Sequence, residues 1–168
     1  MGTSQTAKNP GAATPAPPQA GKEKPKLANF LCFAIYSANL AFGRAYKPIL
    51  DELGLTYTQY IALVALSEKD DQTVGELGEK MFLESNTLTP ILKKLEQIGL
   101  ISRRRDPQDE RQVRVSLTAA GRSLADADPG ASLTDATGLG DDLDEVQQSV
   151  ARLRDNLLRA TQGELGKP

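Results

Sequence analysis

The sequence predicts a mainly α-helical fold that carries one small β-hairpin, an α+β class. Two patterns support this prediction. Apolar residues recur at helical spacing over residues 27–53 and again over residues 141–161. Between these stretches, residues 112–117 alternate in period two after the turn-forming run DPQDE, as a hairpin strand does.

The N-terminal stretch, residues 1–26, has almost no large apolar side chain and is rich in Pro, Ala, Gly, Thr and Lys. We expect a disordered arm, because this stretch cannot bury enough surface to offset the entropy of ordering. It lacks the apolar core of a signal peptide, and no apolar run reaches the ~18 residues that span a bilayer. We therefore expect a cytoplasmic protein with no membrane partner, one folded domain over residues 27–162 and a tail over residues 163–168.

Residues 27–54 predict a long first helix that ends near Gly54. Pro48 should kink this helix or shift its last turn, because its ring removes a backbone hydrogen bond. The apolar stripe is wide, so more than one face is buried. We expect the helix to pack against a second subunit in a homodimer.

Two shorter helices follow the first. Thr58 is expected to cap one of them, which runs to about Glu68. Thr73 is expected to cap the other, and Glu76 three residues later completes the spacing of a capping box.

The segment SNTLTPILKKLEQIG predicts a further helix, which Gly99 ends. Its leucine and isoleucine stripe faces the core, so its polar and basic face lies opposite. Pro90 costs nothing if it lies in the first turn, and the regular helix then begins as late as Thr87. The sequence allows a start at Thr87 or earlier.

Residues 100–117 predict two strands joined by a charged loop, and Thr118 starts the next helix. Short helix, turn, helix and hairpin make a winged helix-turn-helix, here a DNA-binding lobe over about residues 57–118. Dimerisation helices flank it over about residues 27–54 and 119–162. In such a unit the second helix lies in the major groove, and an arginine on the hairpin can enter the minor groove.

The net charge of −2 hides a basic segment. Residues 86–114 hold seven basic and four acidic side chains, a net charge of +3, whereas residues 27–85 and 115–168 each carry −4. The local charge therefore indicates double-stranded DNA as a partner, although the whole chain is acidic.

Short hydrogen-bonding side chains open the predicted groove helix, two lysines follow, and arginines lie on the hairpin. We expect DNA contacts from Ser85, Asn86, Thr87, Thr89, Lys93, Lys94, Arg103, Arg105, Asp109 and Arg111. Arg111 has two compatible interpretations: it pairs with Asp106 or Asp109 and stiffens the hairpin, or it enters the minor groove while Asp109 braces it. A solvated charged helix beside a surface hairpin is the alternative for the whole pattern.

The composition argues against an enzyme. The chain has no histidine and one cysteine, which excludes a Ser-His-Asp triad, a Cys-His pair, ordinary zinc sites and an intrachain disulfide. No Gly-rich phosphate loop appears either. We expect no enzymatic activity, no metal and no cofactor.

The single cysteine, Cys32, lies in the apolar pattern of the first helix. A cysteine in such a place commonly only fills space. However, Tyr36 is one helical turn away, and Tyr46, fourteen residues away, returns close to the same face. Two phenols can stabilise a thiolate by hydrogen bonding, and a thiolate reacts with a peroxide to give a sulfenic acid. Packing and redox chemistry both stay open on these residues alone.

The segment LTPILKKLEQIGLISRRRDPQDERQVRVSLTAAG resembles the winged helix of MarR-type transcription regulators. Its most specific part has the pattern DxxDxRxxxVxLT. This pattern is matched by Asp106, Asp109, Arg111, Val115, Leu117 and Thr118. The stretch NFLCFAIYSANLAFGRAYKPILDELGLTYTQY resembles the organic-hydroperoxide-sensing, OhrR-type branch.

This resemblance implies a homodimeric repressor of an organic hydroperoxide reductase gene, bound to an inverted-repeat operator. It implies that Cys32 senses organic hydroperoxides and is held by Tyr36 and Tyr46, commonly from the other subunit. With no second cysteine, the oxidised thiol forms a mixed disulfide with a low-molecular-weight thiol or overoxidises. Pro129 ends the helix after Thr118 about a turn earlier than is usual in the family.

The sequence is compatible with two other functions. One keeps the DNA binding but makes the effector a small aromatic ligand bound between the two lobes, with Cys32 structural. The other is a thiol peroxidase, which usually needs a resolving thiol and an activating arginine or histidine. Arg44 is about three turns from Cys32, so the sequence disfavours the peroxidase.

Overall fold

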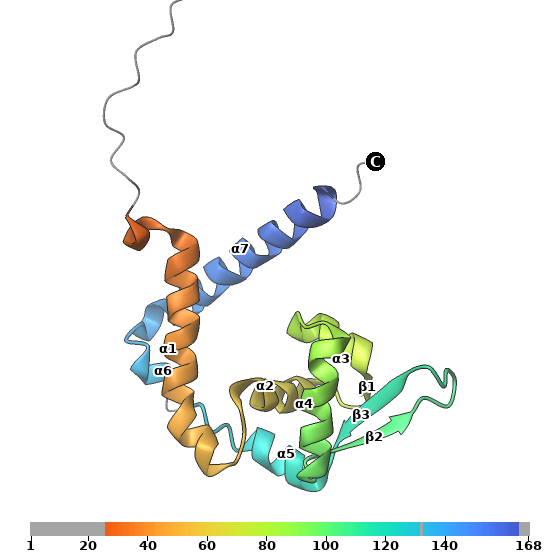
Figure 1. The fold of residues 1–168 in the computed structure, drawn as a ribbon. Coiled ribbons are helices and arrows are strands. Elements are labelled where there is room, and N and C mark those ends of the chain that lie inside the picture. The colour runs from red at the N-terminus through yellow and green to blue at the C-terminus, as the bar shows by residue number, and fades with distance from the viewer. Residues whose placement is uncertain (1–25, 132, 165–168) are drawn as a thin grey trace, which may run out of the picture. The chain divides into compact units, whose positions relative to one another are not determined.

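The computed structural model describes residues 26–131 and 133–164, and it confirms the predicted fold class (Figure 1). The chain divides into two compact units, Met1–Ser37 and Ala38–Pro168. Apart from Lys26, the predicted arm lies outside the described residues, as do residues 165–168 of the predicted tail. The described elements are η1 (Leu27–Asn29), α1 (Leu31–Glu52), α2 (Tyr57–Glu68), β1 (Gln72–Thr73), α3 (Val74–Met81), α4 (Ser85–Gln97), β2 (Ile101–Arg105), β3 (Val113–Leu117), α5 (Ala119–Asp126), α6 (Leu133–Ala136), η2 (Gly140–Asp142) and α7 (Leu143–Glu164).

Helix α1 is shorter at its start than predicted. Residues 27–29 form a 3-10 turn, and Phe30 has an extended backbone, so the α-helix begins at Leu31. At its end the amide of Leu55 donates to the carbonyl of Leu50 at 2.9 Å, around Gly54 with a φ of +65°. Glycine suits this position because it adopts the left-handed region without a steric cost.

The cap of helix α2 is Thr56, so the prediction of Thr58 was wrong. The Thr56 hydroxyl accepts from the amide of Gln59, and the Gln59 side chain accepts from the amide of Thr56 at 2.8 Å. Only Thr56 has a glutamine three residues later, which is what a reciprocal cap requires. Thr58 lies inside the first turn.

Helix α3 has the predicted cap. The Thr73 hydroxyl accepts from the amide of Glu76, and the Glu76 carboxylate accepts from the amide of Thr73 at 2.7 Å. Hydrogen bonding from Thr73, and then from the ammonium group of Lys69, lowers the pKa of Glu76 to about 2. Phe82 ends the helix with a left-handed backbone, φ +56°.

Helix α4 starts at Ser85, which is earlier than the latest start that the sequence allowed. Pro90 therefore lies inside the helix and deprives the carbonyl of Asn86 of its usual backbone donor. The buried side chains of Leu88, Leu92 and Leu95 hold the helix against the core.

The described part of the sheet has three antiparallel strands in the order β1–β3–β2. The register pairs Arg103 with Val115 and Gln72 with Val115 on the other edge. Figure 1 shows β2 and β3 extending together as the predicted hairpin. Strand β1 was not predicted, because two residues are too few to show a period of two.

The core lies between helices α2, α3 and α4 and the sheet. Its fully buried side chains include Leu63, Leu66, Leu77, Leu88, Leu92, Leu95 and Val115. In contrast, Leu50 is the one buried residue of α1, and α7 buries no side chain over residues 143–161. Several large apolar side chains of these two helices are exposed, namely Leu40, Phe42, Val146, Val150, Leu157 and Leu158.

Candidate nucleic-acid interface and thiol site

Helix α4 presents most of its predicted polar residues to solvent. Ser85, Asn86 and Thr87 are exposed at its start, and Lys93 and Lys94 are exposed further on. All five side chains lie on the part of the helix that the buried leucines leave free. The free face thus carries the donors and positive charges that a groove-reading helix uses.

Thr89 differs from its neighbours. It is half-buried, and its hydroxyl donates to the carbonyl of Ser85 at 2.6 Å. This local bond occupies the donor of Thr89, so only its oxygen lone pairs remain for a ligand.

The tip of the hairpin is organised by Asp109. Its carboxylate accepts from the backbone amide of Arg111 at 3.0 Å and from the side chain of Gln112 at 3.1 Å. Across the turn, the Arg105 guanidinium donates to the carbonyl of Glu110 at 2.8 Å. Asp109 therefore braces Arg111 through the main chain.

The Arg111 guanidinium is exposed, and no ion pair of it occurs in the part of the chain that the structure describes. Asp106, one of its two expected partners, pairs with Arg114 at 3.1 Å instead. That carboxylate also accepts from the amide of Gln108 at 2.8 Å. Hydrogen bonds from Gln108 and then Arg114 lower the pKa of Asp106. Asp106 thus pairs with Arg114 in place of Arg111, and the Arg111 side chain stays exposed.

Asp71, which the sequence did not single out, ties the base of the hairpin to the end of α2. Both of its carboxylate oxygens lie 3.0 Å from the Arg104 guanidinium. It also pairs with Arg114 at 3.2 Å and accepts from Ser116 at 3.2 Å. The hydrogen bond from Arg114 is the main reason why the pKa of Asp71 is lowered. Its φ of +52° is a conformation that aspartate tolerates better than most residues.

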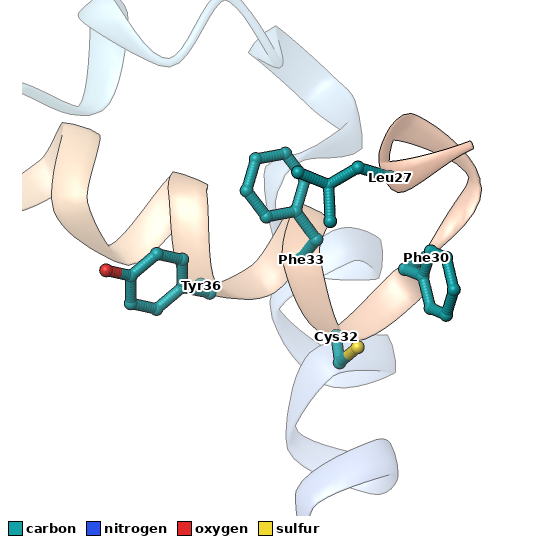
Figure 2. Close-up of a pocket in the computed structure, with 5 residues that line it drawn as sticks. All are labelled: Leu27, Phe30, Cys32, Phe33 and Tyr36. Carbon is teal, nitrogen blue, oxygen red and sulfur yellow. The ribbon is translucent and has the colours of Figure 1, made fainter. Parts of the chain in front are cut away.

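Cys32 is exposed in the first turn of α1 and lines a pocket of about 320 Å³ within the first unit. The other lining residues are Leu27, Phe30, Phe33 and Tyr36 (Figure 2). The Phe33 and Tyr36 rings are tilted, with centroids 6.4 Å apart. In Figure 2 the Tyr36 hydroxyl points away from the Cys32 sulfur, so this chain offers the thiol an apolar surface beside the tyrosine ring.

Tyr46 belongs to the second unit and packs among other tyrosines. Its ring centroid lies 5.0 Å from that of Tyr57 and 5.9 Å from that of Tyr60. Burial raises the pKa of Tyr46, and the charges of Tyr57 and Asp128 raise it further. The phenol therefore stays protonated at neutral pH and can donate a hydrogen bond. Tyr57 and Tyr60 were not predicted as site residues, although their position just after the turn that ends α1 was a signal.

Among residues 26–131 and 133–164, no cluster of three or more His, Cys, Asp or Glu side chains could hold a metal ion. None of the helices described there is both long and apolar enough to cross a bilayer.

The helix-turn-helix, its hairpin and the free basic face of α4 define a winged-helix DNA-binding regulator. Residues 44–127 match the family described as transcriptional regulator SarA/Rot. The chain is 42% identical over 135 residues to the organic hydroperoxide resistance transcriptional regulator of Bacillus subtilis, covering 79% of this chain and 92% of that protein. It belongs to the MarR-type transcription regulators, in their organic-hydroperoxide-sensing branch.

Solved structures agree with this assignment. AbfR of Staphylococcus epidermidis has a TM-score of 0.69 at 33% identity, covering 81% of this chain and 94% of that one. The DNA complex of overoxidised AbfR has a TM-score of 0.66 at 36% identity, covering 79% and 94%. That of reduced AbfR has 0.66 at 35% identity, covering 79% and 96%. These relatives are transcription regulators and not enzymes, which confirms the prediction of a non-enzymatic protein.

Proposed function

We propose that this regulator is a homodimeric repressor that senses organic hydroperoxides at Cys32 and releases its operator when Cys32 is oxidised. The observation that carries the proposal is the exposed thiol in an apolar pocket of about 320 Å³. Because burial of a hydrocarbon group in such a lining is favourable, the pocket supports an organic hydroperoxide over hydrogen peroxide. Release would derepress a peroxide-detoxification gene, as the name of the Bacillus relative suggests.

The uncovered faces of α1 and α7 support a homodimer. Val150 of α7 is 46% exposed and Leu157 is 59% exposed, and Phe42 of α1 is 44% exposed. Several large apolar side chains exposed on one helix commonly mark a protein contact. A two-fold dimer would present two α4 helices to successive major-groove segments of an inverted repeat.

The DNA-reading part of the proposal rests on α4 and the tip of the hairpin. The exposed polar start of α4 and its two lysines suit base edges and phosphates. Arg111, braced by Asp109 through its backbone amide, suits the narrow minor groove beside each half-site. Arg105 and Arg103 are already engaged within the chain, by Glu110 and Glu96, and we propose for them the lesser role of phosphate contacts.

Tyr46 would assist the thiol across the dimer. Fourteen residues span roughly 21 Å along an α-helix, which is too far for a phenol to reach Cys32 within one helix. A donor at Tyr46 therefore acts on the Cys32 of the second subunit. Tyr36, whose hydroxyl points away from the sulfur, would shape the pocket or meet the partner chain.

The proposed reaction has two steps. The Cys32 thiolate attacks the hydroperoxide, the O–O bond breaks, and the thiol becomes a sulfenic acid while the alcohol leaves. A small thiol then attacks the sulfenic sulfur, a mixed disulfide forms and water leaves. This second step needs an external thiol, because the chain has one cysteine. The added group would overfill the helix contacts around Cys32 and separate the two wings.

AbfR is described bound to DNA both reduced and overoxidised. Because overoxidised AbfR is still found on DNA, the two complexes support the mixed disulfide as the form that leaves the operator, and not a further oxidised sulfur. Peroxide alone and peroxide with a small thiol are thus expected to act differently on this protein.

The test uses a labelled inverted-repeat operator with wild type and Cys32→Ser. We expect cumene hydroperoxide with a small thiol to release wild type, peroxide alone to release it less, and Cys32→Ser to stay bound in every arm. Mass spectrometry of the released protein should find one thiol adduct. Equal responses of wild type and Cys32→Ser would refute the sensing role and favour release by a non-covalent aromatic ligand.

A further inference from the structure

The turn Asp128–Gly130 lies against the phenols of Tyr46 and Tyr60. The Tyr60 hydroxyl donates to a carboxylate oxygen of Asp128 at 3.1 Å. A β-carbon at position 130 would lie 2.5 Å from the Tyr46 hydroxyl oxygen and 2.6 Å from a carbon of its ring. Only a glycine lets the main chain pass this close to Tyr46.

The turn exists because α5 ends early. The helix stops at Asp126, and Asp128 has a φ of +40°, which reverses the chain before Pro129. The amide of Ala131 then donates to the carbonyl of Asp128 at 3.0 Å and closes the turn. The early end of α5 and the reversal at Asp128 thus bring a tight turn onto Tyr46.

Tyr46 is confined from three directions. The Tyr57 and Tyr60 rings pack against it at 5.0 Å and 5.9 Å, and Gly130 meets its hydroxyl end. Tyr60 is 4% exposed and is held by Asp128 through its hydroxyl. The orientation of the Tyr46 hydroxyl therefore depends on a turn more than eighty residues further along the chain.

We propose that Asp128 and Gly130 are positioning residues that hold the Tyr46 hydroxyl in place for the Cys32 thiolate of the second subunit. This inference rests on the proposed function. A hydrogen bond to a charged group is strong only in good geometry, so a displaced phenol loses most of its effect on the thiolate. Neither residue touches the reacting sulfur or the peroxide.

The main test is Gly130→Ala in the full-length reduced protein, with Gly75→Ala as the matched control. The added methyl group of Gly130→Ala meets Tyr46, whereas at Gly75 the nearest atom is 3.9 Å away. Two rates are measured. The first is alkylation of Cys32 by iodoacetamide at neutral pH, and the second is loss of the free thiol in buffer that contains cumene hydroperoxide, with peroxide-free buffer as the blank. We expect both Gly130→Ala and Tyr46→Phe to slow the two reactions about tenfold, and Gly75→Ala to leave them unchanged.

A double variant separates positioning from a general structural effect. If Gly130 acts through Tyr46, Gly130→Ala combined with Tyr46→Phe reacts no more slowly than Tyr46→Phe alone. Additive slowing would mean that the turn acts independently of Tyr46 and would overturn the inference. Operator affinity and dimer mass of the reduced variants should match those of wild type.

Asp128 and Tyr60 provide a second route should Gly130→Ala fail to fold. Asp128→Asn keeps an acceptor for Tyr60 and tolerates a positive φ, so it should react nearly as fast as wild type. Asp128→Ala and Tyr60→Phe remove the bond and should slow the thiol. Equal rates for Asp128→Asn, Asp128→Ala and Tyr60→Phe would overturn the role of Asp128.

The outcomes also separate this inference from the proposed function. If Tyr46→Phe reacts at the wild-type rate, assistance by the tyrosine is wrong and the inference falls with it, while peroxide release through Cys32 can still hold. If Tyr46→Phe is slow but Gly130→Ala and Tyr60→Phe are not, the positioning role alone is wrong.

Discussion

Arg103 of β2 and Glu96 of α4 form an ion pair that joins the hairpin to the proposed recognition helix. The guanidinium Nε and Nη2 atoms of Arg103 lie 2.9 Å and 2.6 Å from one carboxylate oxygen of Glu96. The side chains are 21% and 38% exposed, so solvent screens the pair only in part. The pair links the two elements that are proposed to contact neighbouring grooves.

Glu96→Gln should lower specific operator affinity although it removes a negative charge from a DNA-binding face. Loss of the charge strengthens non-specific attraction, while loss of the pair frees the hairpin from α4. We expect a stability loss of about 0.5–1 kcal/mol and a smaller ratio of specific to non-specific affinity. Thermal melting measures the loss of stability, and competition with unrelated DNA measures the affinity ratio. Glu79→Gln on α3 is the control, and an unchanged ratio in Glu96→Gln would show that the pair does not orient the hairpin.

Arg111→Ala should weaken operator binding by roughly 1–3 kcal/mol and leave folding intact. The reason is that this guanidinium is exposed and makes no ion pair among the described residues. The slope of log affinity against log salt should also fall by about one. Arg111→Lys keeps the charge but lacks the planar guanidinium, so its operator affinity should lie between those of wild type and Arg111→Ala. A lowered melting temperature of Arg111→Ala would instead indicate a structural role.

Asp71 and Asp106 should make the stability of the lobe depend on pH. The pKa of each is lower in the folded protein than its ordinary value. Their contribution to the free energy of unfolding is therefore fully present above the unfolded pKa, near 4, and is lost as the pH falls through the folded pKa values.

Asp71→Asn tests this pH dependence, because it keeps the left-handed backbone but removes the charge. We expect it to lower the melting temperature at pH 7 and to flatten the decline below about pH 5. Asp51→Asn, which breaks an exposed surface pair, serves as the control; identical acid profiles of wild type and Asp71→Asn would contradict this role.

Thr56→Ala should destabilise the protein by about 1 kcal/mol, because it removes the side-chain half of the capping box of α2. Thr58→Ala makes the same change two residues later, inside the helix, where alanine has the higher helical propensity. It should be neutral or slightly stabilising. Chemical unfolding of the two variants compares the positions directly, and the reverse order would mean that Thr58 is the cap in solution.

Leu157→Glu should dissociate the dimer without unfolding the winged helix. Leu157 is 59% exposed in a single chain, so a charge there is costly only where a second subunit covers it. We expect monomers by sedimentation, loss of operator binding and an unchanged melting transition of the DNA-binding lobe. Gln148→Glu, off the apolar stripe of α7, should remain dimeric. Dimers of Leu157→Glu at the wild-type affinity would place the interface elsewhere.

Features with local causes were predicted well from the sequence. The cap at Thr73 depends on Glu76, three positions later, and it is confirmed. The predicted helix start at Thr118 is confirmed as well, since α5 begins at Ala119 and the Thr118 hydroxyl accepts from the amide of Gly121. The hairpin depends on a period of two and a short turn, and it too is confirmed. The wrong cap at Thr58 has the same origin: two threonines lay close together, and the deciding residue was the glutamine three residues after Thr56.

Contacts between distant segments had no such signal. Asp71 and Arg104 are separated by 33 residues and each looked like an ordinary surface charge. Strand β1 is recognisable only through its pairing of Gln72 with Val115.

The winged helix-turn-helix, the basic segment and the single thiol could be predicted from the sequence, because periodicity, turn chemistry and composition act over a few residues. Which charges are free and which are paired is known from the folded chain alone, since an arginine meets its carboxylate through folding and not through spacing. In the fold Arg111 stays exposed, Arg103 pairs with Glu96, and Gly130 lies against the hydroxyl of Tyr46.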